Sequence, residues 1–420
     1  MKSVTFFSFL CCLLLAGCTK RERINPLDPE NPRTQGRPEA PLLYSVLDTV
    51  VLSWREYSFS DLDSIRIFRK IEGEGEFELL ETIDPEQSEV RDFPVSYEKR
   101  HWYSISLNAR EYESLRSEAA GIRPGPTFLW ASDIERGQIV RYTHDGAHEV
   151  FRSQPLFLEP IDIALDTLNQ VIWVADAIAS EILRVDFSGR IGLSLRGIKR
   201  IYQLRLDPAD QSLLVLSRLD STLTRYATDG QEVMQVRGLN RPVALRVHAA
   251  DRSLFVLEKS RRRIVHLSAA GDSIGSLQGF SAPYDLAIDS KANLLWVADS
   301  TSVLRIDLRD GSRTAIDGFD MAYRVAVEPA SGACWVIDWS PEREKSAVVQ
   351  VSRDGQVRFR LGGFTDPRSL AVNSYNGNCF VAETLAGTLS EVSVRGELLS
   401  RTATRGGLID LAVQPAPAPR

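Results

Sequence analysis

The sequence predicts an all-β chain in which a β-propeller follows a small β-sandwich, and three observations support this fold class. Apolar strand-like segments recur about every 41 residues between residues 127 and 414. Each repeat carries the same turn signals, and residues 39–121 carry a separate set of alternating segments. A repeat of this length is one supersecondary unit that must stack on its neighbours to bury its apolar surface.

The first marker of the repeat is a short apolar strand. The central residues of successive strands are separated by 41, 41, 41, 39, 45 and 41 positions. These central residues are Ile163, Leu204, Leu245, Leu286, Val325, Leu370 and Leu411.

Two further markers recur in step with the first. One is a strand that ends in an acidic or hydroxyl residue, as in Trp173–Asp176 and Trp296–Asp299. The other is a turn that ends in glycine, as in Asp229-Gly230 and Asp310-Gly311, where glycine supplies the positive φ of a tight hairpin. Each period therefore predicts four strands, and closed radial stacking of such units removes long free sheet edges.

The number of markers predicts the number of blades. Each marker occurs seven times, which predicts seven blades, and six blades are the alternative if one degenerate repeat is only a connection. The first aromatic strand, near Trp130, has no apolar strand before it, and the last apolar strand, Asp410–Gln414, has nothing after it. The two ends of the repeat region should therefore complete one blade together.

The repeats resemble those of the NHL-repeat family of propellers. The Pro-x-x-Leu-Ala-x-Asp and Trp-Val-Ala-Asp elements carry the likeness, and both are clearest within Pro283–Asp299. Arg205 and Arg246 replace the small residue of this pattern, so the second and third repeats are degenerate. The resemblance implies a binding propeller or, as in some relatives, a hydrolase or lyase.

Residues 39–121 predict the β-sandwich. Val50–Trp54 is an apolar strand with a large aromatic side chain, and Ser64–Arg69 and Trp102–Leu107 alternate with a period of two. The segment resembles a fibronectin type III module, which implies a spacer or an adhesive unit. The residues that carry this likeness are Trp54, Ile67-Phe68-Arg69, Asp92, Tyr103, Ile105, Leu107, Ala109, Glu113-Ser114 and Ser117.

The N-terminus has the pattern of a lipoprotein signal peptide. Lys2 precedes an apolar run from Val4 to Ala16, which is too short to span a bilayer stably. The run ends in Leu15-Ala16-Gly17-Cys18, which resembles the lipobox of bacterial lipoproteins. This resemblance implies that residues 1–17 are removed and that Cys18 carries the lipid; an ordinary signal peptide with a chance cysteine is the alternative. Thr19 and not Asp follows Cys18. The resemblance therefore implies a lipoprotein of the outer membrane, whose folded body faces the periplasm or the cell surface.

Proline-rich segments flank the folded body. Residues 18–38 are predicted to be a semi-rigid tether, because each proline fixes φ and extends the preceding residue. Residues 415–420 are rich in proline and alanine and are predicted to be a disordered tail.

Composition excludes other classes of protein. The net charge is −6 and no long basic tract occurs, which argues against a nucleic-acid partner. No other stretch approaches the roughly 18 apolar residues of a membrane-spanning helix. Of the cysteines, only Cys334 and Cys379 fall in the predicted folded body. They are interpreted as buried thiols, so the fold is not expected to depend on disulfides.

No catalytic residue, metal site or cofactor is predicted. Gly271–Gly275 matches the nucleophile elbow by letter, but that elbow needs a strand-turn-helix context and this segment predicts a hairpin. Asp133, Asp176, Asp299 and Asp338 recur with the blades and are interpreted as structural turn caps. His144 and His148 flank a turn, which is interpreted as solvated and not as a metal site.

A recognition surface is predicted on one face of the propeller and in its channel. The loops that enter the first strand and leave the second strand of each blade share this face, and aromatic and arginine residues are typical of recognition surfaces. Scattered surface aromatics are the alternative. The candidate binding residues are Tyr202, Arg205, Arg241, Arg246, Tyr284, Tyr323, Arg324, Trp339 and Arg368.

The channel allows two interpretations. Most innermost strands carry alanine where Arg205 and Arg246 stand, and two positions earlier Asp162, Asp285, Asp410 and Arg324 point to the same side. Acids and arginines should therefore gather near the axis. They could form a ring of salt bridges between blades, or the two arginines could be fork-shaped donors to an anionic or polar ligand group.

The sequence thus favours a cell-envelope lipoprotein attached to the membrane through its N-terminal lipid. Its propeller is predicted to be a non-catalytic binding or scaffold module for a protein, peptide or glycan. The alternative is a propeller hydrolase or lyase with a metal or acid-base site in the central channel.

Overall fold

The computed structural model describes residues 28, 36–57, 62–109, 112–342 and 344–415. The predicted signal peptide, Cys18, almost all of the tether and tail residues 416–420 lie outside the described residues. The elements in the described part of the chain are β-strands, and no helix long and apolar enough to cross a membrane is found there. The chain forms two compact units, one built mainly from Val51–Asp92 and Lys99–Ile122 and the other mainly from Arg123–Arg420.

Two sheets form before residue 123. The three-stranded sheet contains β1 (Leu42–Val46), β2 (Thr49–Ser53) and β5 (Glu89–Asp92). The five-stranded sheet contains β3 (Ser64–Ile71), β4 (Glu78–Ile83), β6 (His101–Ala109), β7 (Tyr112–Glu113) and β8 (Ala120–Ile122).

The alternating residues of these strands form a buried core. Ile65 and Ile67 of β3 and Ile105 of β6 are fully buried, because side chains two positions apart share one face of a strand. Asp92 of β5 accepts hydrogen bonds from the Tyr103 hydroxyl at 2.6 Å and from Arg69 at 2.9 Å. This carboxylate therefore joins the two sheets.

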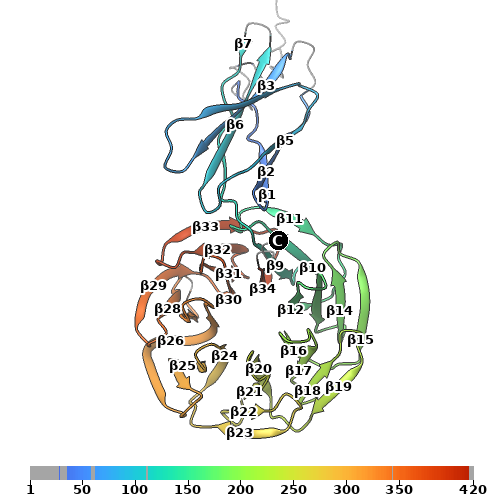
Figure 1. Cartoon of the computed structure of the whole chain (residues 1–420), viewed down its shortest axis with the longest axis vertical. Coiled ribbons are helices and arrows are strands. Elements are labelled where there is room, and N and C mark those ends of the chain that lie inside the picture. The colour runs from blue at the N-terminus through green and yellow to red at the C-terminus, as the bar shows by residue number, and fades with distance from the viewer. Residues whose placement is uncertain (1–27, 29–35, 58–61, 110–111, 343, 416–420) are drawn as a thin grey trace, which may run out of the picture. The chain divides into compact units, whose positions relative to one another are not determined.

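The larger unit is a β-propeller, in which four-stranded antiparallel sheets surround a central axis (Figure 1). One sheet contains, from the axis outwards, β34 (Leu408–Gln414), β9 (Phe128–Asp133), β10 (Gln138–Tyr142) and β11 (Glu149–Arg152). The next contains β12 (Pro160–Asp166), β13 (Val171–Asp176), β14 (Glu181–Asp186) and β15 (Ile191–Arg196). Then come β16 (Ile201–Leu206), β17 (Leu213–Ser217), β18 (Thr222–Tyr226) and β19 (Glu232–Val236). These are followed by β20 (Pro242–Val247), β21 (Leu254–Glu258), β22 (Arg263–Leu267) and β23 (Ser273–Leu277).

The next stretch of chain forms one six-stranded sheet. Its strands are β24 (Pro283–Asp289), β25 (Leu294–Asp307), β26 (Arg313–Val327), β27 (Cys334–Asp338), β28 (Ser346–Val351) and β29 (Val357–Phe364). The long strand β25 pairs with β24 up to Asp299 and with β26 beyond it, and β26 pairs with β27 from Ala322 onwards. Each long strand thus takes the place of two successive strands.

The last sheet contains β30 (Pro367–Val372), β31 (Cys379–Glu383), β32 (Thr388–Val392) and β33 (Leu398–Ala403). Within the described residues, the pairing divides into seven groups of four strands, which fits the seven predicted blades.

The two ends of the repeat region meet in one sheet, as predicted. β34 pairs antiparallel with β9, with Leu411 opposite Ala131 and Ala412 opposite Trp130. The Trp130 indole also donates a 2.9 Å hydrogen bond to Gln414. The C-terminal strand therefore closes the ring from the inside.

The repeated residues fill the space between blades. Trp173 packs with Ile201 and Leu204 of the following blade, and Trp335 packs with Cys379 and other residues of β31 and β32. Cys334 and Cys379 are buried free thiols, as predicted. The aromatic marker and the apolar marker of neighbouring repeats thus build one core between them.

The recurring acids at the ends of second strands are turn caps, as predicted. Asp176 accepts hydrogen bonds from the backbone N–H groups of Leu158 at 2.6 Å and Ala179 at 3.0 Å. Asp299 accepts in the same way from Ser281 and Ala282. Both acids bind the loop that enters the first strand, and Asp176 also binds the loop that leaves the second. These bonds support the face that is predicted to carry recognition residues.

Candidate functional site

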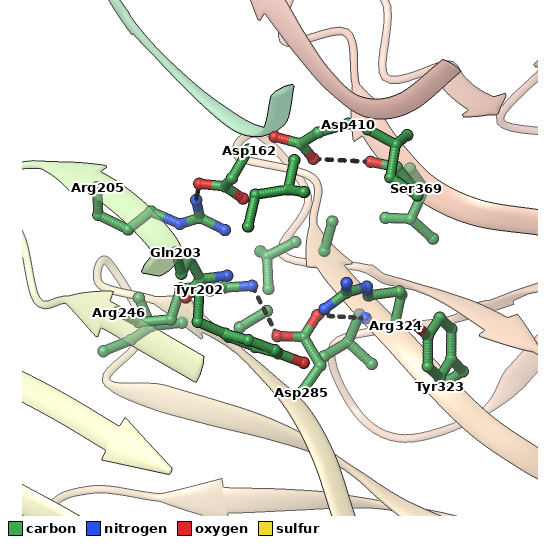
Figure 2. A pocket seen from close by; sticks show the side chains of 18 residues that line it. Asp162, Tyr202, Gln203, Arg205, Arg246, Asp285, Tyr323, Arg324, Ser369 and Asp410 are labelled. Atoms are coloured by element: carbon green, nitrogen blue, oxygen red, sulfur yellow. Dashed lines mark hydrogen bonds and ion pairs between the residues drawn. The ribbon is translucent and has the colours of Figure 1, made fainter. Parts of the chain in front are cut away.

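The innermost strands of all blades line a cavity of about 470 Å³ at the propeller axis (Figure 2). These strands are β34, β12, β16, β20, β24, the second half of β26, and β30, and they contact one another in this order around the ring. Equivalent positions on the strands therefore lie at similar depths along the channel.

The cavity lining changes in character along the strands. The residues just before the repeat centres form the ionic level, and those that line the cavity are Asp162, Gln203, Asp285, Arg324, Ser369 and Asp410. One position nearer the start of each strand is the mouth level, where the lining residues are Ile161, Tyr202, Tyr323 and Ile409. Just beyond the repeat centres the lining residues are Arg205, Arg246, Ala287 and Ala326.

Side chains of the ionic level join each blade to the next. The Asp162 carboxylate accepts the backbone N–H of Leu204 at 2.6 Å, and the Gln203 side-chain oxygen accepts that of Leu245 at 2.7 Å. In the same way, the N–H of Val325 donates to Asp285 at 3.2 Å. The N–H of Ile163 donates to Asp410 at 3.0 Å, across the point where the ring closes. One repeat position therefore acts as an inter-blade acceptor.

Arg246 has a full set of partners across three blades. Its guanidinium lies 3.0 Å from an Asp285 oxygen on one side and 3.3 Å from the Gln203 oxygen on the other. It also donates to the Leu245 carbonyl at 2.8 Å. The side chain of Arg246 is only 16% exposed and that of Asp285 only 3%. Burial lowers the pKa of Arg246 to about 10, so the guanidinium keeps its charge at neutral pH. Its contact with Asp285 matches the predicted inter-blade salt bridge.

Arg205 has a weaker partner. It donates to the Leu204 carbonyl at 2.5 Å and lies 3.4 Å from Asp162. Burial and the negative charge of Asp410 raise the pKa of Asp162 to about 8, so this carboxyl is mostly protonated at pH 7. The proximity of Arg205 and Asp162 therefore does not make a full ion pair, and the Arg205 side chain remains 29% exposed.

Arg324 points into the cavity from the ionic level (Figure 2). Its Nε donates to the Arg368 carbonyl at 3.3 Å, and its guanidinium carbon lies 5.0 Å from the Tyr323 ring centre. Burial opposes the charged form, but nearby Tyr323 and Asp285 outweigh it and raise the pKa of Arg324 above its usual value. None of the ion pairs between described residues includes Arg324, whereas Arg205 and Arg246 each take part in one.

Aromatic and cationic side chains lie side by side at the starts of the innermost strands and in the loop that leaves β27. The Tyr284 and Tyr323 ring centres are 6.0 Å apart, and Arg368 lies 5.9 Å from both the Tyr323 and the Trp339 rings. Asp366 accepts the Trp339 indole N–H at 3.1 Å and pairs with Arg368 at 2.7 Å. We refer to Tyr284, Tyr323, Trp339 and Arg368 as the rim cluster. It is continuous with the cavity because Tyr323 belongs to both.

The structure brings most of the predicted binding residues together. Tyr202, Arg205, Arg246, Tyr323 and Arg324 line the cavity. Tyr284, Trp339 and Arg368 belong to the rim cluster. Arg241 is exposed on the loop before β20 and is not part of the cavity lining.

Sequence reasoning missed Gln203 and Ser369. Both occupy the repeat position of Asp162 and Asp410, so alignment of the strands on their central residues could have found them. The side-chain types obscured this equivalence, because Gln203 has an amide and Ser369 a hydroxyl at the position where other blades have acids. Ser369 donates a 3.0 Å hydrogen bond to Asp410.

Other motifs hold no converging chemistry. Gly271–Gly275 lies in the β22–β23 hairpin, as predicted. The solvated turn predicted around His144 is wrong for this residue, which is buried with its Nδ1 2.6 Å from the Thr127 hydroxyl. The described residues contain no group of three or more His, Cys, Asp or Glu side chains that could hold a metal ion.

Solved structures with a similar fold support the propeller architecture. A functionally unknown protein from Desulfotomaculum acetoxidans DSM 771 matches with a TM-score of 0.60 and 12% identity, over 69% of this chain and 99% of that one. Hydrazine synthase from Kuenenia stuttgartiensis matches with a TM-score of 0.54 and 14% identity, over 60% and 89% of the two chains. Virginiamycin B lyase from Staphylococcus aureus matches with a TM-score of 0.51 and 12% identity, over 59% and 84%. No family model and no curated protein matches the sequence. At these identities the likeness shows the fold alone, so the comparisons establish an all-β chain with a β-propeller.

Proposed function

We propose that this chain is a cell-envelope lipoprotein whose propeller is a non-catalytic binding module. The observation that supports binding most directly is the axial cavity of about 470 Å³, to which every blade contributes. Its volume is within the range of about 300–1,000 Å³ found for small-molecule sites. Polar and ionic groups converge in it, as specific recognition requires.

The rim cluster supports the same role. Tyrosine, tryptophan and arginine provide most of the energy at recognition sites, because they offer large rigid surfaces with polar ends. Tyr323 joins the rim cluster to the cavity lining. A ligand that lies across the rim can therefore place one group in the channel. A protein chain end, a peptide or a glycan would fit this arrangement.

The sequence supports the remaining parts of the proposal. Cys18 would carry the lipid, residues 18–38 would form the tether, and the N-terminal sheets would form a fibronectin type III-like spacer before NHL-like repeats. A semi-rigid spacer would hold the propeller away from the lipid surface. The lipid would place the chain in the cell envelope, with the outer membrane favoured by Thr19.

A hydrolase or lyase is the second candidate, and the acids of the channel favour it. Asp162 is mostly protonated at neutral pH because burial and Asp410 raise its pKa to about 8. A carboxyl with a raised pKa beside a second carboxyl is an arrangement that general acid-base catalysis uses. However, both side chains also hold backbone N–H groups of the next blade, which gives them a structural role.

The binding role can be tested with a panel of defined probes. We would measure the affinity of neutral and acidic monosaccharides and short peptides for the wild-type protein by calorimetry. Probes that bind in the cavity should lose at least about tenfold in affinity with Tyr323→Ala, since stacking of this kind contributes about 1.4 kcal/mol or more. Tyr112→Ala is the matched control, because Tyr112 is an exposed tyrosine of β7. Probes that bind Tyr323→Ala as well as wild type, or a panel in which nothing binds, would contradict the proposal.

A further inference from the structure

The Asp285 and Asp410 carboxylates of the cavity already have partners. The Arg324 guanidinium has no ion-pair partner among the described residues. Asp285 is paired with Arg246 and also accepts the N–H groups of Leu286 at 2.9 Å and Val325 at 3.2 Å. Asp410 accepts from the Ser369 hydroxyl and the N–H of Ile163, both at 3.0 Å. Neither acid forms an ion pair with Arg324 within the described part of the chain.

The available atoms of Arg324 define a particular geometry. Its Nε donates a hydrogen bond to the Arg368 carbonyl. The two terminal nitrogens therefore remain available as donors in one plane, like the prongs of a fork. Two parallel N–H donors in a plane match the two oxygens of a carboxylate. The Tyr323 ring, 5.0 Å from the guanidinium carbon, holds the fork in place beside the cavity.

The charge of the cavity agrees with one missing negative group. The lining contains three arginines, Arg205, Arg246 and Arg324, and three aspartates, Asp162, Asp285 and Asp410. Asp162 contributes little negative charge at pH 7, because burial and Asp410 raise its pKa to about 8. The lining is therefore left with one net positive charge, and a half-buried charge without a partner is costly.

Further cations surround the mouth of the channel. Arg218 lies 5.6 Å from the Tyr202 ring centre, and Lys259 lies 3.7 Å from that of Tyr284. Burial and the nearby charges of Arg218 and Arg241 lower the pKa of Lys259. A positive mouth attracts anions and speeds their binding.

We infer that the cavity binds its ligand through a single carboxylate, held by the guanidinium fork of Arg324, with the rest of the ligand against Tyr202 and Tyr323. This inference rests on the proposed binding function and names the chemistry of the ligand. One planar fork and one surplus charge favour a carboxylate over a doubly charged phosphate. A sugar acid and the C-terminus of a peptide offer the same group.

The experiment compares probes that differ only in the carboxylate. One arm uses glucuronic acid against glucose, and the other uses an acetylated dipeptide with a free C-terminus against its amide. Inorganic phosphate is a third probe. Each is titrated into wild type, Arg324→Gln and Arg324→Lys, and the melting temperature of each variant is recorded. Arg190→Gln is the control for lost charge, because Arg190 lies on an exposed hairpin turn and its side chain is 84% exposed.

We expect at least one acid to bind wild type about tenfold or more tightly than its neutral partner, as a charge-assisted forked pair requires. Arg324→Gln should abolish this preference, Arg324→Lys should retain only part of it because it keeps the charge without the fork, and Arg190→Gln should keep all of it. The arm that shows the preference identifies the source of the carboxylate. If Arg324→Gln does not fold, a reduced preference in a normally melting Arg324→Lys variant supports the inference, and an unchanged preference there would overturn it.

The outcomes separate this inference from the proposed function. Equal binding of acids and neutral partners, or an acid preference that survives in Arg324→Gln, would overturn the carboxylate assignment while the binding role stands. Tighter binding of phosphate through Arg324 would also overturn it. If no probe binds wild type, the binding role and the inference fall together.

Discussion

The side-chain oxygen of Gln203 accepts the backbone N–H of Leu245 in the next blade at 2.7 Å. The same oxygen lies 3.3 Å from Arg246. Gln203 is buried, and Leu245 is fully buried. One amide therefore satisfies a backbone group and orients an arginine at the axis, in the place that acids take in three other blades.

Gln203→Leu should destabilise the propeller. It leaves the Leu245 N–H without an acceptor in a buried position, which costs about 1–3 kcal/mol. Urea unfolding measures the loss. Gln203→Glu is the control, because it keeps an acceptor oxygen, and it should remain close to wild type. Equal stability of Gln203→Leu and wild type would show that the inter-blade bond contributes nothing.

Arg246→Ala should reduce stability more than Arg205→Ala. Arg246 pairs with the buried Asp285, so its removal should cost about 2–3 kcal/mol. Arg205 is more exposed and faces a mostly protonated Asp162, so its removal should cost less than about 1 kcal/mol. Chemical unfolding of the two single variants and the double variant tests this order. A larger effect of Arg205→Ala would mean that Asp162 is ionised in the folded protein.

The repeat predicted the strands well because each marker residue has the same packing task in every blade. Trp173 and Leu204 lie in the same core between two blades, so both had to be apolar, and their spacing was visible in the sequence. The fusion of strands in β25 and β26 was not predictable. It depends on how the backbone continues through Ser300 and Ala322, and neither residue type signals a continuous strand.

The candidate site was predictable as a set of residues but not as a set of partners. Arg205, Arg246 and Arg324 look alike in the sequence, since each stands near an acid of its own or a neighbouring repeat. Only the structure distinguishes them. Asp285 is shared by Arg246 and two backbone N–H groups, and this competition leaves Arg324 available. Three-dimensional competition for one carboxylate has no local sequence signal.

Asp162 should make stability depend on pH in a defined direction. Burial and Asp410 raise the pKa of Asp162 from 3.8, the usual value for an aspartate, to about 8 in the folded state. The folded protein therefore keeps a proton that the unfolded chain releases, so this contribution to stability is complete below about pH 4 and is lost as pH rises towards about 8. Asp162→Asn cannot ionise, and its amide oxygen can still accept the Leu204 N–H.

The test compares the urea unfolding of wild type and Asp162→Asn at about pH 5 and about pH 9. Stability of Asp162→Asn relative to wild type should rise between these values. Asp229→Asn, which removes a charge from an exposed hairpin turn, is the control for a general charge effect. A constant difference between Asp162→Asn and wild type across this range would contradict the raised pKa.

Cys18→Ser should release the protein from membranes. If the lipid on Cys18 is the anchor, the variant loses several acyl chains and with them stable membrane attachment. Fractionation of cells that express wild type or Cys18→Ser measures the share of protein in the membrane. Cys11→Ser is the control, because Cys11 belongs to the predicted signal peptide. A variant that stays in the membrane fraction would show that the lipobox interpretation is wrong.

Deletion of Leu408–Gln414 should destabilise the whole propeller and not only its last blade. The deletion removes β34, exposes the edge of β9 and leaves the Ile163 N–H without the Asp410 carboxylate. The inter-blade contact between β34 and β12 is lost at the same point, so the ring is opened where its two ends meet. Loss of several kcal/mol should lower the melting temperature by about 10 °C or more.

A variant that lacks only residues 416–420 keeps β34 whole and should melt like wild type. Circular dichroism at a β-sheet wavelength follows both transitions, and an unchanged melting temperature after removal of β34 would mean that the ring does not depend on this closure.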